Sequence, residues 1–254
     1  MEMISSVNNE TVKRVASLSE KKYRKQNGTF LVESYKLVSE VVGGSMELVK
    51  LYVEQSVVDK YTDIIKKCEP NVVVLSQAAF NKISDTVSSQ GIIAEVKMKD
   101  AKEFDFSEPF IILDRISDPG NMGTIIRTAA AVGYKNIVLI NCSDPYNPKT
   151  VRSSAGGIFY TNFHQISFDE LMEKVKKANA GIYIADMNGE NVFNLKATDK
   201  VYGLVIGNEG GGISEAFRKN ATKVISLPMK SQMESLNAAV SGSVIMYQLK
   251  KDEF

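Results

Sequence analysis

The most informative stretch of the sequence is residues 225–247, ISLPMKSQMESLNAAVSGSVIMY. Its apolar start is typical of a strand that ends at Pro228, and the polar loop that follows leads into a pattern predicting a helix over residues 236–250. Ser235 is placed to cap this helix, and Asn237 faces the same region. Loops held between rigid elements are where binding and chemistry concentrate. We therefore expect a binding site here.

A second polar loop follows the apolar strand predicted at residues 110–114. The sequence DPGN at residues 118–121 is a turn signal, and Asn121 is placed to cap a helix that starts near residue 123 and runs over residues 124–132. Arg127 lies one turn into this helix, among small and apolar side chains. An arginine there is able to bind an anionic substrate close to the helix N-terminus.

The third loop is GNEGGG at residues 207–212, between a strand predicted at residues 201–206 and a helix at residues 214–218. Glycine is needed where backbone approaches a ligand closely. The loop has neither the lysine of a P-loop nor the spacing of a dinucleotide fingerprint, and Glu209 would repel a phosphate. A nucleoside carrying a positive sulfonium suits this loop better.

The rest of the chain alternates strands and helices around a charged segment at residues 97–109, where we place a linker. Before it, the pattern predicts helices at residues 11–25, 34–42, 56–68 and 77–83 and strands at 29–32, 48–53, 72–75 and 92–96. After it, strands are predicted also at 137–140, 162–166, 181–186 and 223–227, and helices also at 148–155 and 168–178. This alternation favours an α/β fold with a mostly parallel sheet.

The composition is that of an ordinary soluble globular protein, with 254 residues, 44% hydrophobic and 24% charged. The sequence shows no apolar run of about 20 residues and no signal peptide, so we expect a cytoplasmic protein without a membrane segment. The two cysteines, Cys68 and Cys142, lie in no metal-binding motif, and His164 is the single histidine. These residues favour neither a metal site nor a Ser/His triad.

The first thirty residues are rich in basic side chains, notably Lys21, Lys22, Arg24 and Lys25. One interpretation is a solvated helix face with local ion pairs. The other is a surface that binds the phosphate backbone of a nucleic acid. The pattern alone leaves both open.

Together the three loops resemble those of the SpoU, or TrmH-like, branch of the SPOUT RNA methyltransferases. The resemblance covers about residues 110–247 and rests on Asn121-x-Gly123-x-x-x-Arg127, on Gly207-Asn208-Glu209-Gly210 followed by Gly212-Ile213-Ser214, and on Leu227-Pro228-Met229 through Glu234-Ser235-Leu236-Asn237. Residues 28–33 and 89–94 resemble the family's N-terminal RNA-binding domain, which is similar to the L30e ribosomal protein. Ser34 and Ala239 depart from the family's usual glycine and serine.

The resemblance implies two domains: a small α/β L30e-like RNA substrate-binding domain at residues 1–100 and a SPOUT methyltransferase domain at residues 108–254 with a C-terminal deep trefoil knot. It also implies S-adenosylmethionine as cofactor. Carried onto this chain, the cofactor contacts fall on Gly207, Leu227 and Leu236, with Met187 and Asn188 as further candidates.

The implied reaction is methylation of a ribose 2′-hydroxyl, in ribosomal RNA by preference and in transfer RNA otherwise. The resemblance implies that Arg127 lies at that hydroxyl and acts as a base assisted by a substrate phosphate. Because a guanidinium is a poor base, an equal alternative is that Arg127 orients the substrate phosphate and stabilises developing alkoxide charge. Asn121 would position Arg127 or the ribose, while Glu209, Ser235 and Asn237 would shape the loops or contact substrate and cofactor.

Family resemblance also implies a homodimer whose interface includes the final helix, through Val244, Ile245 and Leu249. Two alternatives stay open at this point. One is a non-catalytic RNA-binding or ribosome-assembly protein that retains the fold, and the other is a nucleotide-binding α/β enzyme of different chemistry.

Overall fold

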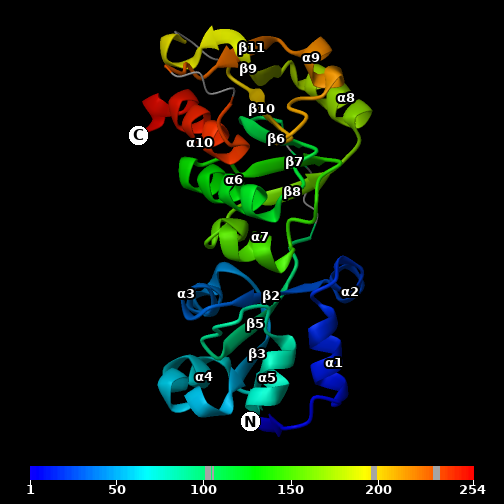
Figure 1. Ribbon diagram of the computed structural model, residues 1–254, viewed down its shortest axis with the longest axis vertical. Helices are drawn as coiled ribbons and strands as arrows, with labels where there is room; N and C mark the ends of the chain where they lie inside the picture. The colour runs from blue at the N-terminus through cyan, green and yellow to red at the C-terminus, as the bar shows by residue number, and fades with distance from the viewer. Residues whose placement is uncertain (101–103, 105, 196–198, 231–234) are drawn as a thin grey trace. The chain divides into compact units, whose positions relative to one another are not determined.

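The computed structural model describes residues 1–100, 104, 106–195, 199–230 and 235–254. It divides into two compact units, one of Met1–Asp100 with Tyr146–Phe159 and the other of Ala101–Pro145 with Tyr160–Phe254 (Figure 1). The segment Tyr146–Phe159, expected in the second domain, thus belongs with the first unit. The domain limits at residues 100 and 108 stay a prediction.

The first unit contains a five-stranded sheet in the order β1-β4-β3-β5-β2. Strands β1, β4 and β3 run parallel, and β5 is antiparallel to both β3 and β2. The strands are β1 (Glu2–Ile4), β2 (Thr29–Glu33), β3 (Leu48–Glu54), β4 (Val72–Leu75) and β5 (Ile92–Lys97). The helices are α1 (Glu10–Ser17), α2 (Lys21–Asn27), α3 (Tyr35–Glu40), α4 (Thr62–Cys68), α5 (Gln77–Ile83) and α7 (Pro148–Ser153).

Two predicted helices of this unit differ from the structure. The one expected over residues 11–25 is interrupted after Ser17, so that α1 and α2 are separate, and Gly28 ends α2 in the left-handed region at φ +66°. The one expected over residues 56–68 is α-helical only from Thr62, because two short 3-10 turns precede it. Strand β1, three residues long, was not predicted.

The second unit is built on a six-stranded sheet in the order β11-β9-β10-β6-β7-β8, with every described pair parallel. The prediction of an α/β fold with a mostly parallel sheet is therefore confirmed. The strands are β6 (Phe110–Asp114), β7 (Asn136–Ile140), β8 (Asn162–Gln165), β9 (Gly181–Asn191), β10 (Tyr202–Gly207) and β11 (Lys223–Ser226). The knot implied by the resemblance stays a prediction.

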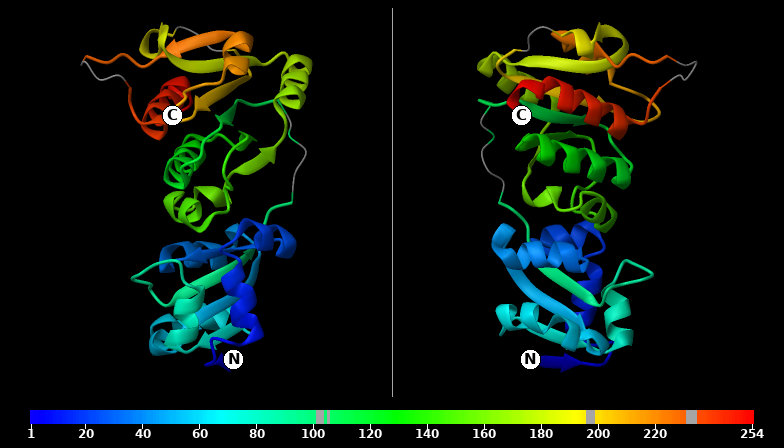
Figure 2. Two further views of the ribbon diagram at one scale, coloured as in Figure 1. Left: turned by 45° about the vertical axis from the view of Figure 1, so that its right-hand side comes forward. Right: turned by 90° about the vertical axis from the view of Figure 1, so that its left-hand side faces the viewer.

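Helices cover both faces of this sheet (Figure 2). One face packs on α8 (Phe168–Ala178) and α9 (Glu215–Asn220) through buried side chains such as Leu171 and Phe217. The opposite face carries α6 (Pro119–Val132) and α10 (Ala238–Leu249), which lie side by side. At Gly242, α10 comes so close to β10 that an added Cβ would lie 2.6 Å from Ile206 Cδ1. Burial on both faces explains the nearly continuous apolar sequence of the central strands.

Because all six strands are parallel, their carboxyl ends lie along one edge of the sheet. The loops that follow β6 and β10 leave from neighbouring strands there. Ligands of open α/β sheets bind at this edge.

Candidate active site

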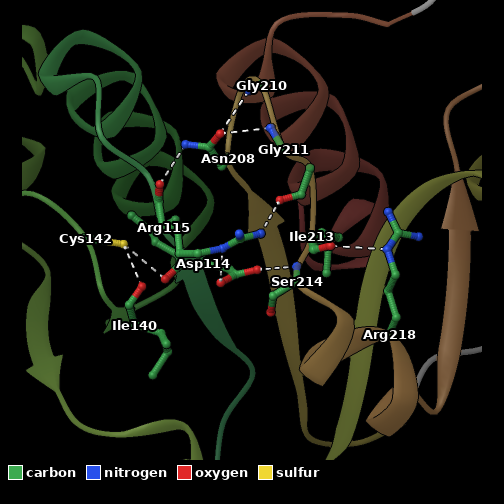
Figure 3. Close-up of polar contacts among 12 residues, drawn as sticks. Asp114, Arg115, Ile140, Cys142, Asn208, Gly210, Gly211, Ile213, Ser214 and Arg218 are labelled. Carbon is green, nitrogen blue, oxygen red and sulfur yellow. Dashed lines mark hydrogen bonds and ion pairs between the residues drawn. The ribbon is translucent and has the colours of Figure 1, made fainter.

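The GNEGGG loop is organised by the side chain of Asn208 (Figure 3). Its Oδ1 accepts hydrogen bonds from the backbone N–H groups of Gly210 and Gly211, both at 2.9 Å, and its Nδ2 donates to the carbonyl of Arg115 at 2.9 Å. Gly207 begins the loop, and a Cβ there would lie 2.5 Å from the carbonyl carbon of Gly212. Only glycine therefore allows the two ends of the loop to approach each other.

Asp114, at the end of β6, ties the far end of the same loop to the sheet. Its carboxylate is 1% exposed and accepts from the backbone N–H of Ser214 at 2.6 Å and from Nε of Arg115 at 3.2 Å. Arg115 in turn donates from Nη2 to the carbonyl of Gly212 at 3.1 Å (Figure 3). A buried carboxylate costs free energy unless it is well paired. Movement of the loop would leave the Asp114 carboxylate without these partners, so the network rigidifies the loop. No pattern in the sequence predicts this network, because its members are up to 100 positions apart.

Asn121 joins the three loops. Its Nδ2 donates to Oε1 of Glu209 at 2.7 Å, and its Oδ1 accepts from Nδ2 of Asn237 at 2.9 Å. Residues more than eighty positions apart in the chain thus form one hydrogen-bonded row. The structure brings together these three predicted site residues.

Both predicted helix caps are wrong, and the true caps lie three residues earlier and two residues later. Asp118 caps α6 by accepting from the N–H of Asn121 at 2.8 Å, and Pro119 takes the first helical position. Asn237 caps α10, accepting from Ala239 N at 2.9 Å and Val240 N at 3.2 Å. The side chain of Asn121 is thereby left free for the contacts between loops. Ser235 makes no cap.

A cavity of about 320 Å³ lies beside this row. Among the predicted cofactor residues, Gly207, Leu227, Leu236 and Met187 line it, as do the predicted catalytic residues Glu209 and Ser235. Asn188 does not line it; its N–H donates to Asp186 Oδ1 at 3.3 Å.

The cavity wall also contains an ion pair that the sequence analysis missed. Asp186 on β9 and Arg218 on α9 both line the cavity and bind each other, and Arg218 Nε also donates to the carbonyl of Ile213 at 3.1 Å. The hydrogen bond from Arg218 holds the pKa of the Asp186 carboxyl below its usual value. Asp186 and Arg218 are 32 positions apart in the sequence, and no local pattern links an acid to an arginine over that separation.

Arg127 is placed differently from the expectation. Because α6 starts at Pro119, Arg127 lies more than two turns into the helix, and it does not line the cavity. Its side chain is exposed, and within the described part of the chain it has no hydrogen-bond or ion-pair partner, Asn121 included. The neighbouring Thr128 bonds Ser243 of α10 at 2.8 Å. Arg127 is therefore free to bind a ligand that lies outside the cavity.

The basic residues of the N-terminal segment differ in their exposure. Lys21, Lys22 and Lys25 are exposed on α2. Arg24 is only 2% exposed and donates from Nη1 to the carbonyls of Leu18 and Ser19, both at 2.7 Å. Its expected role in RNA binding is corrected to a structural one, the linking of α1 to α2.

The described residues contain no group of three or more His, Cys, Asp or Glu side chains suited to a metal ion. None of their helices combines the length and apolar character needed to cross a membrane.

Comparison with known proteins decides the family. A model of the SpoU rRNA Methylase family matches residues 108–247, more than half of the chain. The chain belongs to the SpoU rRNA methylase family. The resemblance inferred from the three loops is thus confirmed. A model of the MRM3-like substrate binding domain matches residues 9–94 of this SpoU family member.

Curated relatives match over most of the chain. The 23S rRNA (guanosine(2553)-2′-O)-methyltransferase RlmP of Bacillus subtilis is 30% identical over 98% of this chain and 100% of its own. The 23S rRNA (guanosine-2′-O-)-methyltransferase RlmB of Neisseria meningitidis serogroup B is 28% identical over 80% of this chain and 87% of its own.

Solved structures share the fold of this SpoU family member. The AdoMet-bound rRNA methyltransferase from Sinorhizobium meliloti has a TM-score of 0.86 at 22% identity, over 100% of this chain and 98% of that one. The SpoU methyltransferase AviRb from Streptomyces viridochromogenes, in complex with the cofactor AdoMet, has a TM-score of 0.86 at 24% identity, over 97% and 98%.

Proposed function

We propose that this protein transfers the methyl group of S-adenosylmethionine to a ribose 2′-hydroxyl of RNA, with ribosomal RNA as the substrate. The observation that carries the proposal is the row Glu209–Asn121–Asn237 beside the cavity lined by Gly207, Leu227 and Leu236. Family membership and the names of the relatives support the same activity. The intact site favours an enzyme over a non-catalytic RNA-binding or ribosome-assembly protein.

The residues of the cavity fit S-adenosylmethionine. Its volume of about 320 Å³ lies within the range of small-molecule sites, about 300–1,000 Å³. Apolar side chains such as Ile206 and Leu227 offer walls for an adenine ring, and the carboxylates of Asp186 and Glu209 suit a ligand that carries a positive sulfonium. When bound, the cofactor supplies an electrophilic methyl group. Asn188, outside the lining, is the weakest of the proposed cofactor residues.

Arg127 is proposed as the residue that binds the RNA phosphate next to the target ribose. Because a guanidinium group is a poor general base, orienting the phosphate and stabilising negative charge on the 2′-oxygen suit Arg127 better than acting as a base. Asn121, Glu209 and Asn237 would hold the loops in position for the ribose, and Ser235 would contact substrate or cofactor. Alignment of the two reactants is then the main contribution of the protein.

Lys21, Lys22 and Lys25 are proposed to bind the phosphate backbone of the RNA. All three are exposed on α2, and each such contact contributes to affinity in a salt-dependent way. Transfer RNA stays a second possible substrate.

The protein is further proposed to act in the cytoplasm as a homodimer, without a metal ion. Helix α10 would contribute Val244, which is 37% exposed, whereas Ile245 is 1% exposed and belongs to the core of its own unit. Because α6 packs beside α10, a subunit bound on α10 would also lie near Arg127.

The test is methyl transfer from tritiated S-adenosylmethionine to ribosomal RNA from cells that lack the gene. The wild-type protein should label the RNA, and the Arg127→Ala variant should not. Because Arg127 does not line the cavity, the affinity of Arg127→Ala for S-adenosylmethionine in calorimetric titration should stay within about twofold of wild type. Full labelling by Arg127→Ala would contradict the assigned role. No labelling by the wild type of either ribosomal or transfer RNA would contradict the proposed function.

A further inference from the structure

The first unit presents one exposed aromatic ring with an unusual support. Tyr35, the first residue of α3, is 46% exposed, and it is the one aromatic side chain among the exposed large hydrophobic residues that the structure describes in this unit. Its ring stacks on that of Tyr61, with centroids 5.3 Å apart and an angle of 18° between the planes. Tyr61 is only 3% exposed. One face of Tyr35 is thus covered by a core residue, and the exposure belongs to its other face and edges.

The two rings are held by Gln90, in the loop before β5. The N–H of Tyr35 donates to Oε1 of Gln90 at 2.7 Å, and the hydroxyl of Tyr61 donates to the carbonyl of Gln90 at 2.8 Å. Ser34, at φ +115°, caps α3 by accepting from the N–H of Leu37 at 3.4 Å and so fixes where α3 begins. The start of α3, the Tyr61 ring and the Gln90 loop therefore hold the exposed ring of Tyr35 in place. Little conformational freedom is lost when a ligand stacks on it.

One lysine side chain lies over the Tyr61 ring, and a second lysine is the neighbour of Tyr35 in the sequence. The ammonium of Lys60 lies 5.2 Å from the centroid of the Tyr61 ring, and Lys36 follows Tyr35 directly on α3. Lys36 is exposed and, in the part of the chain that the structure describes, has no ion-pair partner. The acidic Asp59 precedes Lys60, so the surface is mixed in charge rather than strongly basic. Stacking, more than phosphate binding, is what this surface offers.

We propose that Tyr35, supported by Tyr61, is a stacking platform for an unpaired nucleobase of the RNA substrate. This inference rests on the proposed function, because it takes the partner to be RNA. Sequence-specific RNA recognition targets single-stranded loops and bulges, whose bases stack on exposed aromatic side chains. Every base has a π-face, so the platform selects unpaired RNA over duplex without selecting a particular base.

The experiment uses the full-length protein and a short single-stranded RNA with 2-aminopurine at its centre, compared with a blunt duplex of the same sequence. Wild type and Tyr35→Phe, which keeps the ring, should quench the 2-aminopurine on binding. Tyr35→Leu keeps an apolar side chain of similar volume but no π-system, and it should bind the single strand about 5- to 100-fold more weakly. Affinity for the duplex should not change.

Salt dependence separates this platform from the lysines of α2. Tyr35→Leu should weaken binding by the same factor at every salt concentration, whereas replacing Lys21, Lys22 and Lys25 by Gln should reduce the slope of log Kd against log salt. Circular dichroism and calorimetric titration with S-adenosylmethionine check that Tyr35→Leu folds and keeps its cofactor site.

Wild-type quenching and affinity in Tyr35→Leu would overturn the platform, even if the protein methylates RNA. An equal affinity of wild type for single strand and duplex, without quenching, would overturn it as well. Failure of the proposed function is a separate result. It would appear as a wild-type protein that transfers no methyl group to RNA but still quenches 2-aminopurine in the single strand.

Discussion

Asn237 combines two tasks that substitution can separate. Its Oδ1 caps α10 through the N–H groups of Ala239 and Val240, and its Nδ2 donates to Asn121. Asn237→Ala removes both, at a cost of about 1 kcal/mol for the cap and about 1 kcal/mol for the side-chain hydrogen bond. In a unit of this size the sum lowers Tm by roughly 4–8 °C.

Asn237→Asp keeps an acceptor at the helix N-terminus, where a negative charge is favourable, but loses the donor to Asn121. We expect its Tm within about 2 °C of wild type and methyl transfer reduced about tenfold, as in Asn237→Ala, because in both variants Asn121 loses its link to α10. Ser235→Ala is the matched control for stability: Ser235 makes no cap, so its Tm should not change.

Thermal unfolding followed by circular dichroism and transfer of a tritiated methyl group measure the two effects independently. A Tm loss in Asn237→Asp as large as that in Asn237→Ala would refute the capping assignment. Full methyl transfer by Asn237→Asp would refute a role for the row Glu209–Asn121–Asn237 in the reaction.

Three further predictions concern the cavity and its surroundings. Gly207→Ala should weaken binding of S-adenosylmethionine at least about tenfold in calorimetric titration, because its Cβ would lie 2.5 Å from Gly212; unchanged affinity would contradict the close approach. Arg218 lowers the pKa of Asp186 in the folded protein, so Asp186 should stabilise the fold at neutral pH. This contribution should be lost as the pH falls from 3.8, the ordinary pKa of Asp, through the lower pKa of folded Asp186. The urea midpoint of wild type should therefore exceed that of Asp186→Asn at pH 7, and the difference should shrink as the pH falls through the lowered pKa of Asp186; a constant difference would argue against the ion pair. Burial raises the pKa of the Cys142 thiol to about 11, so iodoacetamide at pH 8 should alkylate it far more slowly than it alkylates glutathione, and mass spectrometry showing equal rates would contradict this placement.

Much of the fold could be predicted because the hydrophobic pattern is strong where elements are buried on one or both faces. The strand at residues 110–114 and the helices at residues 77–83 and 168–178 have the predicted bounds. The caps could not be ranked, because two candidates lie close together at each helix start. Asp118 competes with Asn121 and Ser235 with Asn237, and only the tertiary contacts of Asn121 and Asn237 decide between them.

Polar partners that are distant in sequence could not be predicted, either in the first unit or at the candidate active site. Glu95 is 1% exposed and accepts hydrogen bonds from Arg14, Tyr52 and Thr29. No local sequence pattern predicts these three donors. Asp186 with Arg218 was missed for the same reason. The cluster of basic residues around Arg24 favours an RNA-binding surface, but the carbonyls of Leu18 and Ser19 accept hydrogen bonds from Arg24 and allow it to be buried.

The central claim is that this SpoU family member methylates a ribose 2′-hydroxyl, and the most direct measurement is mass-spectrometric mapping of modified nucleosides in ribosomal RNA from cells with and without the gene. One 2′-O-methylated nucleoside should disappear with the gene, return with the wild-type protein, and not return with Arg127→Ala. A methyl group lost from a base rather than from a ribose, or a set of 2′-O-methyl sites in ribosomal and transfer RNA that the gene does not change, would contradict it.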